Sequence, residues 1–359
     1  MDKSRKIISW IIVITLVMFF SGLSHAQKPY RVGTTTANFL EIGLGAAGNA
    51  MGEAYVGTVK DVTSMYWNPA GLAFMESSEA RFIYHPWIVN TGLYFAGVGL
   101  VLPRIGNLGI SLSHFDFGEE EVTTLDYPDG LGENYSAGSL SIGITYARSL
   151  TNWFAFGSTF KYISQNIWHM TANALAVDLG VVVNTNLFSP TGKNDRGLVI
   201  AMSISNYGTR MRYNGLDALL KGYQSQPWDY EYGTFNDVKS EISTDSWELP
   251  LIFRLGLAYT PLQMANQRLT IGADALHPNN NKESLNLGAE YMMRFMGSAD
   301  IFLRGGYKGL FLEEYEFGPT FGAGILLLAS TNLTVKFDYA FKYAGLFGNA
   351  HCYDIALTF

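Results

Sequence analysis

The feature that most constrains this chain is an alternation of large apolar side chains with small, polar or charged ones. It is clearest over residues 139–147, 153–162 and 334–343. Successive side chains of a β-strand point to opposite faces, so each segment predicts a strand with one apolar face. A soluble sandwich could contain one such strand, but its outer face would be polar. The repetition along the chain favours a membrane barrel, whose strands present apolar residues to lipid and polar residues to the lumen.

Segments of this type recur from residue 80 to the C-terminus. They cover residues 80–89, 92–103, 106–117, 135–149, 152–165, 172–186, 196–207, 249–260, 267–277, 283–295, 299–309, 315–327, 331–342 and 351–359. Bacterial single-chain barrels have an even number of antiparallel strands. The sequence therefore predicts an all-β fold, a 14-stranded antiparallel transmembrane β-barrel over residues 80–359.

Hydropathy and composition point the same way. After residue 26, no apolar run approaches the length of about 20 residues that a membrane helix needs. Only 15% of the residues are charged, against about 25% in soluble domains. A chain that crosses a membrane without apolar helices must do so as a closed barrel, because every backbone polar group in hydrocarbon needs a partner.

The N-terminus has the layout of a secretory signal peptide. Lys3, Arg5 and Lys6 precede an apolar run over residues 7–23, and Ser24-His25-Ala26 offers a small-residue cleavage site. A membrane-anchoring helix is the alternative, although the run lies at the lower limit for spanning a bilayer. Cleavage would remove three cations and Asp2, which moves the formal charge from −7 to −9. We expect a signal peptide at 1–26. Because no cysteine lies at the cleavage site, the chain does not resemble a lipoprotein.

The sequence offers no strong catalytic, cofactor or metal motif. Residues 43–48 match GxGxxG, and Asp61 follows, but no strand precedes them as a nucleotide site requires. Cys352 lacks a partner for a disulfide or a CxxC site. The mature histidines are scattered without paired spacing: His85, His114, His169, His277 and His351. A Ser-His pair assembled across strands stays open as an alternative; otherwise we expect no enzyme, and an acidic chain is a poor partner for nucleic acid.

Loop lengths predict the orientation. The two longest connections, 118–134 and 208–248, follow the third and seventh strands, whereas turns such as 104–105 and 149–151 follow even strands. In outer-membrane barrels the long loops are external and the short turns periplasmic. The connection 187–195 is longer than this pattern expects. We predict a cell outer membrane protein of a Gram-negative-type bacterium, with both chain ends on the periplasmic side.

Charged residues occupy positions opposite the apolar faces of the strands, where they would face the lumen. They are Lys161, Asp178, Arg254, Glu290, Arg294, Arg304, Lys336, Asp338 and Lys342. Because both signs are mixed, we expect them to pair with one another or with an internal segment. A selective ring for ions would instead carry one sign.

The C-terminal residues 353–359 are apolar at every second position and end on Phe359. This tail resembles the terminal-strand signal that the outer-membrane barrel insertion machinery reads. Phe359 is therefore the predicted insertion signal, with that machinery and outer-membrane lipid as predicted partners.

Residues 27–79 precede the predicted barrel and form our predicted N-terminal hatch segment. Residues 43–55 are rich in Gly and Ala and predict a short helix, and a turn at 59–64 leads into 65–73. Pro69 fixes its own φ and pushes Asn68 out of helical geometry, and the Asn68 side chain can satisfy backbone groups of the turn. An open segment cannot face lipid, so we expect it to fold inside the barrel as a hatch or plug.

This segment resembles the N-terminal signature of the PorV/PorQ family, which is related to FadL-type transporters with a hatch and a fourteen-stranded barrel. The resemblance rests on Gly48, Asn49, Ala50, Met51, Gly52, Glu53, Ala54, Tyr55 and Val56, on Asp61, and on Tyr66, Trp67, Asn68, Pro69, Ala70, Gly71, Leu72 and Ala73. Trp228, Tyr230 and Tyr232 in the 208–248 loop match no family pattern.

The resemblance implies two functions. PorV-like proteins serve type IX secretion: they receive exported cargo from the translocon and pass it to the surface-attachment machinery. FadL-like proteins admit fatty acids and other hydrophobic molecules, which leave through a gap in the barrel wall near the hatch. We prefer the first because of the spacing from Asp61 to the Tyr66–Ala73 run. The predicted hatch or gate motif is Asp61, Tyr66, Trp67, Asn68, Pro69 and Gly71, which either fixes the hatch or gates it.

Overall fold

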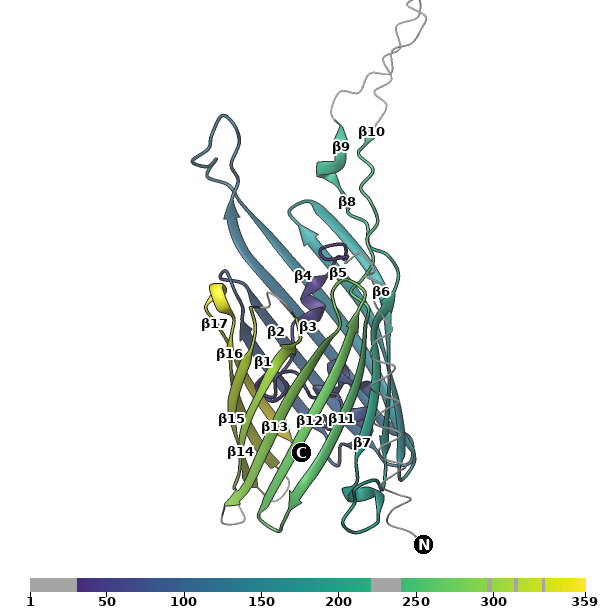
Figure 1. The fold of residues 1–359 in the computed structure, drawn as a ribbon. Coiled ribbons are helices and arrows are strands. Elements are labelled where there is room, and N and C mark those ends of the chain that lie inside the picture. Colours follow the sequence, from purple (N-terminus) through teal and green to yellow (C-terminus); the bar gives the residue numbers. More distant parts are fainter. Residues whose placement is uncertain (1–30, 221–239, 296–298, 313–315, 331–332) are drawn as a thin grey trace, which may run out of the picture. The chain divides into compact units, whose positions relative to one another are not determined.

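A computed structural model describes residues 31–220, 240–295, 299–312, 316–330 and 333–359 (Figure 1). The predicted signal peptide and the loop aromatics Trp228, Tyr230 and Tyr232 lie outside these residues. In the described part of the chain, no helix is both long enough and apolar enough to cross a membrane.

Fourteen long antiparallel strands form one closed ring. They are β1 (Glu79–Pro86), β2 (Gly92–Leu102), β3 (Gly106–Glu121), β4 (Asn134–Thr151), β5 (Phe154–Ile167), β6 (Met170–Asn184), β7 (Val199–Gly208), β11 (Ile252–Gln263), β12 (Gln267–Pro278), β13 (Ser284–Phe295), β14 (Ala299–Leu310), β15 (Pro319–Ser330), β16 (Leu333–Tyr343) and β17 (Asn349–Thr358). Each pairs with its sequence neighbour or, for β7 and β11, across the longest loop, and the β1–β17 pairing completes the ring. This confirms the predicted fourteen-stranded barrel.

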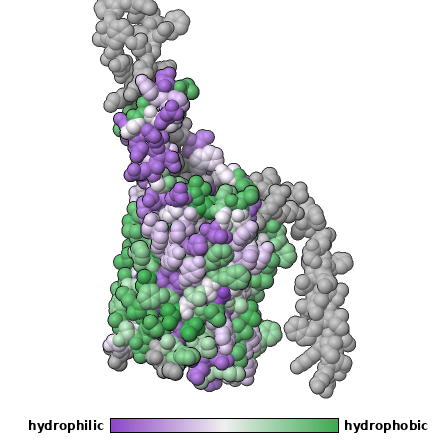
Figure 2. Space-filling view, turned by 90° about the vertical axis from the view of Figure 1, so that its left-hand side faces the viewer, coloured by the Kyte–Doolittle hydropathy of each residue, from purple (hydrophilic) through white to green (hydrophobic). Residues whose placement is uncertain are grey.

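Side chains alternate across this wall as the sequence predicts. On β4 and β5, Ile144 and Phe160 are exposed on the outside, while their neighbours Thr145 and Thr159 are buried and hydrogen-bonded to each other at 2.8 Å. Figure 2 shows hydrophobic residues spread over the lower part of the strand wall and hydrophilic residues gathered above it. Apolar side chains facing outward and polar ones facing inward are typical of a barrel that sits in lipid.

The two ends of the ring differ. At one end, called here the short-turn end, lie the connections 103–105, 152–153 and 264–266, the start of β1 and the end of β17. The opposite, long-loop end carries 122–133 and 209–251, and the latter includes β8 (Asn214–Gly215), η4 (Leu216–Ala218), β9 (Leu219–Leu220) and β10 (Ser240–Glu241) (Figure 1). The connection between β6 and β7 at the short-turn end spans 185–198 and contains η3 (Asn194–Arg196).

Residues 32–78, called here the interior segment, do not belong to the wall. They contain η1 (Asn38–Glu41), α2 (Ala46–Ala50), α3 (Ser64–Trp67) and η2 (Pro69–Phe74). Helix α2 contacts β14 to β17, whereas η2 contacts β3 to β6 on the opposite part of the ring. The segment therefore crosses the space that the strands enclose.

The helix predicted over 43–55 is shorter than expected. It ends at Ala50 because Gly52 and Glu53 both adopt positive φ, of 63° and 65°. Such left-handed residues terminate a helix. The turn they form places Glu53 against the wall, where its carboxylate pairs with Lys308 and Lys342.

Candidate functional site

The interior segment fits the wall because the wall presents glycine where the segment comes closest. A Cβ at Gly157 would overlap the Pro69 carbonyl carbon, and one at Gly306 would overlap the Met51 carbonyl carbon. The same holds for other inward glycines, which would meet segment backbone or Cβ atoms at closer than ordinary distance: Gly180, Gly272, Gly288 and Gly322. A wall with side chains at these positions would leave no room for the segment in its present place.

The turn at Asn68-Pro69 is held by the Asn68 side chain. Its Oδ1 accepts a hydrogen bond from the Ala70 N–H at 3.1 Å, which caps η2, and its Nδ2 donates to the Val181 carbonyl on β6 at 3.1 Å. Pro69 occupies the first position of η2, where its missing N–H costs nothing. Gly71 is needed because a Cβ there would lie 2.6 Å from the Val59 carbonyl oxygen. The motif thus joins the segment to itself and to the wall.

The two aromatic residues of the motif form the centre of the segment's packing. The Trp67 Nε1–H donates to the Leu44 carbonyl at 2.9 Å, and the ring is fully enclosed. Tyr66 packs edge-on against Trp67, with ring centroids 4.8 Å apart. The Arg254 guanidinium lies over both rings, 5.5 and 5.8 Å from their centroids, and donates to the Ser205 Oγ at 2.9 Å. Arg254 is therefore held by π faces and a hydroxyl, without a carboxylate within ion-pair distance among the described residues.

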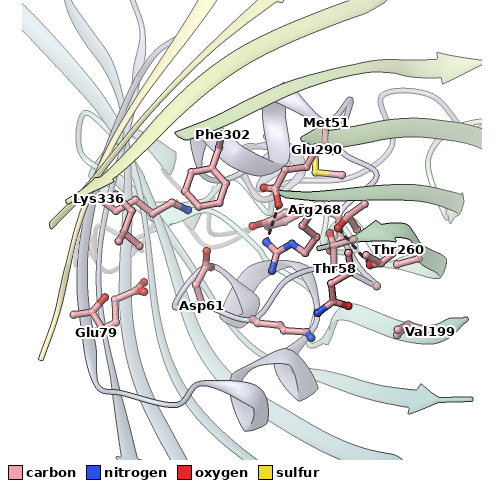
Figure 3. A pocket seen from close by; sticks show the side chains of 18 of the residues that line it. Met51, Thr58, Asp61, Glu79, Val199, Thr260, Arg268, Glu290, Phe302 and Lys336 are labelled. Carbon is pink, nitrogen blue, oxygen red and sulfur yellow. Dashed lines mark hydrogen bonds and ion pairs between the residues drawn. The ribbon is translucent and has the colours of Figure 1, made fainter. Parts of the chain in front are cut away.

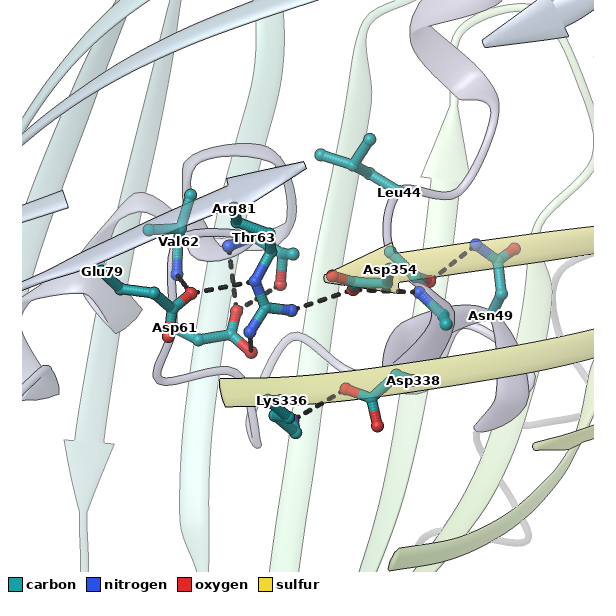
Figure 4. Close-up of polar contacts among 12 residues, drawn as sticks. Leu44, Asn49, Asp61, Val62, Thr63, Glu79, Arg81, Lys336, Asp338 and Asp354 are labelled. Carbon is teal, nitrogen blue, oxygen red and sulfur yellow. Dashed lines mark hydrogen bonds and ion pairs between the residues drawn. The ribbon is translucent and has the colours of Figure 1, made fainter. Parts of the chain in front are cut away.

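Arg81 on β1 links the interior segment to the first and last strands of the barrel (Figure 4). Its guanidinium pairs with Asp61 at 3.0 Å, with Glu79 at 2.9 Å and with Asp354 of β17 at 3.0 Å. Glu79 also accepts the Val62 N–H. Burial opposes ionisation of Asp61, but Arg81 and then Lys336 outweigh it and lower the pKa of this carboxyl. The predicted motif residue Asp61 is thus one corner of a buried ionic cluster at the β1–β17 seam.

A second cluster continues along the inner wall from β16 to β12. The Arg304 guanidinium pairs with Asp338 at 2.6 Å and Glu290 at 2.8 Å. Lys336 pairs with Asp338 at 2.9 Å, and Arg268 pairs with Glu290 at 3.1 Å. Four of the predicted lumen charges therefore meet one another here, and each has a partner of opposite sign.

Glu53 carries the segment's other ionic contact. One of its carboxylate oxygens accepts from the Lys342 ammonium at 2.6 Å and from Lys308 at 2.7 Å. Burial alone would raise the pKa of Glu53, but the two ammonium groups lower it to about 2. The carboxylate is thus fixed in its charged form at ordinary pH.

The remaining predicted residues do not join these clusters. Lys161 and Asp178 form a separate buried pair between β5 and β6. Arg294 pairs with Asp300 at 2.8 Å, half exposed near the short-turn end. Phe359 is 56% exposed beyond β17, and its N–H donates to the Ser78 carbonyl at 2.8 Å.

A polar cavity of about 370 Å³ opens beside the motif at the short-turn end (Figure 3). Its charged and hydroxyl-bearing lining includes Thr58, Lys60, Asp61, Glu79, Arg81, Thr260, Arg268, Thr270, Glu290 and Lys336. Met51 and Phe302 supply apolar wall. The two ionic clusters therefore face one polar recess.

Several residues that hold the segment were not singled out from the sequence. Arg81, Asp354 and Glu53 complete the ionic clusters, and Asp274 of β12 accepts the N–H groups of Tyr55 and Val56 at 2.7 and 2.8 Å. Arg81, Asp274 and Asp354 all stand at inward positions of their strands, so the alternation could have identified them. In the described ranges, His, Cys, Asp and Glu side chains nowhere gather in a set able to hold a metal ion.

Comparison with known proteins agrees with this architecture. The chain is similar in fold to the CymD monoaromatic hydrocarbon channel, with a TM-score of 0.54 and 9% identity over 88% of this chain and 97% of that one. It is also similar to the toluene transporter TodX of P. putida, with a TM-score of 0.54 and 10% identity over 88% and 96%. The toluene transporter TbuX of Ralstonia pickettii gives a TM-score of 0.50 and 10% identity over 88% and 97%. Among curated proteins, none matches in sequence.

Sequence similarity identifies the family more specifically. Residues 24–216 match the family described as type IX secretion system protein PorV. The matched region contains the interior segment with its Asp61 and Tyr66–Ala73 run, together with the strands that η2 contacts. This outer-membrane β-barrel therefore belongs to the PorV family of type IX secretion system proteins.

Proposed function

We propose that the interior segment is a fixed hatch that closes the barrel, and that the protein serves type IX secretion as a docking component rather than as a pore. The observation that carries this proposal is the fit of the segment: glycines of several strands leave room for it, and buried ion pairs bind it to the wall. The predicted signal peptide at 1–26 would export the chain. The short turns would then face the periplasm and the long loops the outside.

Unbroken pairing of β2 with β3 and along most of β3 with β4 supports docking over conduction, although the β6–β7 pairing shifts register between Val177 and Leu179. A FadL-type conduit, as its family is understood, releases its substrate through a gap in the wall near the hatch. Here β2 and β3 pair without interruption from Gly92↔Asp116 to Leu102↔Gly106, and β3 and β4 pair from Asn107↔Ala147 to Asp116↔Gly138. Backbone groups in hydrocarbon are costly to leave unpaired, so such ladders resist opening.

In this role the protein would receive exported cargo from the secretion translocon and pass it to the attachment machinery, without catalysing a reaction itself. Asp61, Tyr66, Trp67, Asn68, Pro69 and Gly71 would fix the hatch rather than gate it. Their hydrogen bonds and ion pairs run to both the segment and the wall, so a movement of the hatch would break many of them together.

A FadL-type conduit for fatty acids or other hydrophobic molecules is the second candidate. Leu346 and Phe347, at the long-loop end, are 89% and 55% exposed and could collect apolar molecules. The similar fold of a monoaromatic hydrocarbon channel and of a toluene transporter supports this second candidate.

Deletion of the gene in its own organism separates the two candidates. Our proposal predicts that surface-attached cargo proteins stay inside the cell or are lost, that plasmid-borne wild type restores them, and that uptake of toluene and of oleate is unchanged. Intact surface proteins together with reduced uptake would favour the conduit and refute the secretion role.

A further inference from the structure

A second cavity lies at the short-turn end, between the interior segment and two connections of the wall. It has a volume of about 620 Å³. Lys60 and Phe74 line it from the segment, Asn152 from the β4–β5 connection, Asn184 from the end of β6, and Lys193 and Asn194 from the β6–β7 connection. Lys60 also lines the 370 Å³ cavity of Figure 3, so the two open side by side.

The two cavities together are called here the recess. The charged side chains of the recess that form no ion pair with a described residue are lysines. Its larger cavity is lined by two lysines, three asparagines and one phenylalanine, and by no carboxylate among the described residues. The acids of the smaller cavity are already engaged: Asp61 and Glu79 with Arg81, and Glu290 with Arg304 and Arg268. Lys60 and Lys193 have no ion pair in the part of the chain that the structure describes. A ligand that brings negative charge would meet two ammonium groups that have no ion pair among the described residues, and near Lys60 it would compete with the Glu76 carboxylate.

The free lysines are positioned by their surroundings. The Lys60 ammonium lies 5.7 Å from the centre of the Phe74 ring. Desolvation by the surrounding protein and the nearby Arg268 lower the pKa of Lys60, whereas the nearby Glu76 raises it. Lys60 and Arg268 thus place two cations beside this part of the cavities.

The β6–β7 connection that carries Lys193 is itself anchored. Its first and last parts pair through Thr185 N–H to Leu198 O at 3.0 Å and Leu198 N–H to Leu187 O at 2.9 Å. It is tied to β11 by the Arg196 Nη2 bond to Gln263 O at 3.2 Å and by the Tyr259 hydroxyl bond to Phe188 O at 3.0 Å. The recess thus has a built outer wall, which reduces the ordering cost of binding.

We propose that this recess binds an acidic peptide segment of an exported polypeptide. Carboxylates of the peptide would pair with Lys60 and Lys193, and the amides of Asn152, Asn184 and Asn194 would bond its backbone. A lipid headgroup fits less well, because Lys60 and Phe74 lie on the segment that the strands enclose, whereas lipid chains stay outside the wall. The inference rests on the proposed function in one respect: the short-turn end faces the compartment from which cargo comes.

The test uses the full-length protein in zwitterionic detergent and a fluorescein-labelled peptide of twelve residues that alternates Glu with Ser or Gly. Binding is followed by anisotropy at low and physiological salt. The K60Q/K193Q double variant should bind about tenfold more weakly, roughly 1.4 kcal/mol, whereas R104Q/R148Q, which removes two short-turn-end cations outside the recess, should stay within twofold. Heat-modifiable migration on gels checks that each variant is folded.

Three outcomes would overturn the proposal: equal binding of a peptide with Gln in place of Glu, equal loss in both double variants, or displacement of the peptide by soluble phosphatidylglycerol that itself requires Lys60 and Lys193. The last result would make the recess a lipid site. In cells, K60Q/K193Q should reduce surface attachment of cargo. If it does not, while gene deletion abolishes attachment, the recess proposal fails and the secretion role stands; if deletion has no effect, the secretion role fails.

Discussion

The interior segment meets the two sides of the barrel by different means. Toward β13–β17 and β1 it adds charge to close glycine contacts: Asp61 pairs with Arg81, and Glu53 with Lys342 and Lys308. Toward β3–β6 it uses neutral contacts, in which η2 lies against Gly157 and the Asn107 amide donates to the Leu72 carbonyl at 2.6 Å. A buried ion pair is destabilised when one of its partners is removed. A close glycine contact is destabilised when a side chain is added. The two sides should therefore fail in different ways when mutated.

A substitution on the charged side should give the largest loss in the free energy of unfolding. Arg81→Met removes the cation shared by Asp61, Glu79 and Asp354, and leaving such buried acids unpaired costs about 3–5 kcal/mol. Urea unfolding of the purified barrel, read by heat-modifiable gel migration, measures it. Arg294→Met removes a half-exposed partner of Asp300 and should cost less than about 1 kcal/mol. Equal losses of unfolding free energy in both variants would show that the buried Arg81 cluster stabilises the protein no more than a half-exposed ion pair does.

The steric side is tested by one added methyl group. Gly157→Ala would drive a Cβ into the Pro69 carbonyl, and such overpacking typically costs about 1–3 kcal/mol. Gly305→Ala is the matched control, because its nearest atoms would lie 3.8 Å away, in ordinary contact. We expect faster proteolysis of the interior segment only in the first variant. Identical proteolysis rates would mean that η2 does not lie against β5.

Asn68→Ala should have a smaller effect on the same side. It removes the cap on η2 and the bond to the Val181 carbonyl, together worth about 1–2 kcal/mol. Asn68→Asp keeps the capping oxygen but loses the donor, so it should recover part of the stability. Hydrogen exchange of the amides of residues 69–74 measures both, and no difference among the three proteins would argue against a fixing role for the motif.

The last prediction concerns the loss of stability in acid. The pKa of Glu53 falls from 4.5 to about 2 in the folded protein, so its contribution is complete above pH 4.5 and is lost as the pH falls toward 2. Unfolding followed between pH 5 and pH 2.5 should therefore show a decline that is weaker in Glu53→Gln. An equal slope in both proteins would exclude Glu53 as a source of acid sensitivity.

The strands of the wall could be predicted from the sequence, but the side-chain contacts inside the wall could not. Alternation located all fourteen strands, because a lipid-facing surface demands an apolar residue at every second position. It also placed Arg304, Lys336 and Asp338 opposite the apolar face, where the structure brings them together. Their pairing depends on strand register, which alternation does not fix.

The longest-range contacts could not be predicted. Arg81 meets Asp354 only because the first and last strands close the ring, and the helix predicted over 43–55 stops at Ala50 so that Glu53 can reach Lys342. Local propensity carries no signal for the ring closure, whereas Gly52, a typical helix terminator, was a local signal for the end of the helix. The glycines that receive the segment are visible in the sequence, but only the path of the segment explains why they are needed.

Solute permeation tests the central claim most directly, because a fixed hatch in a closed wall should seal the barrel. Wild-type protein in liposomes should admit neither a small sugar such as arabinose, followed by swelling, nor toluene above the rate of protein-free liposomes. Permeation of arabinose at rates typical of an open porin, or protein-dependent entry of toluene, would contradict the account.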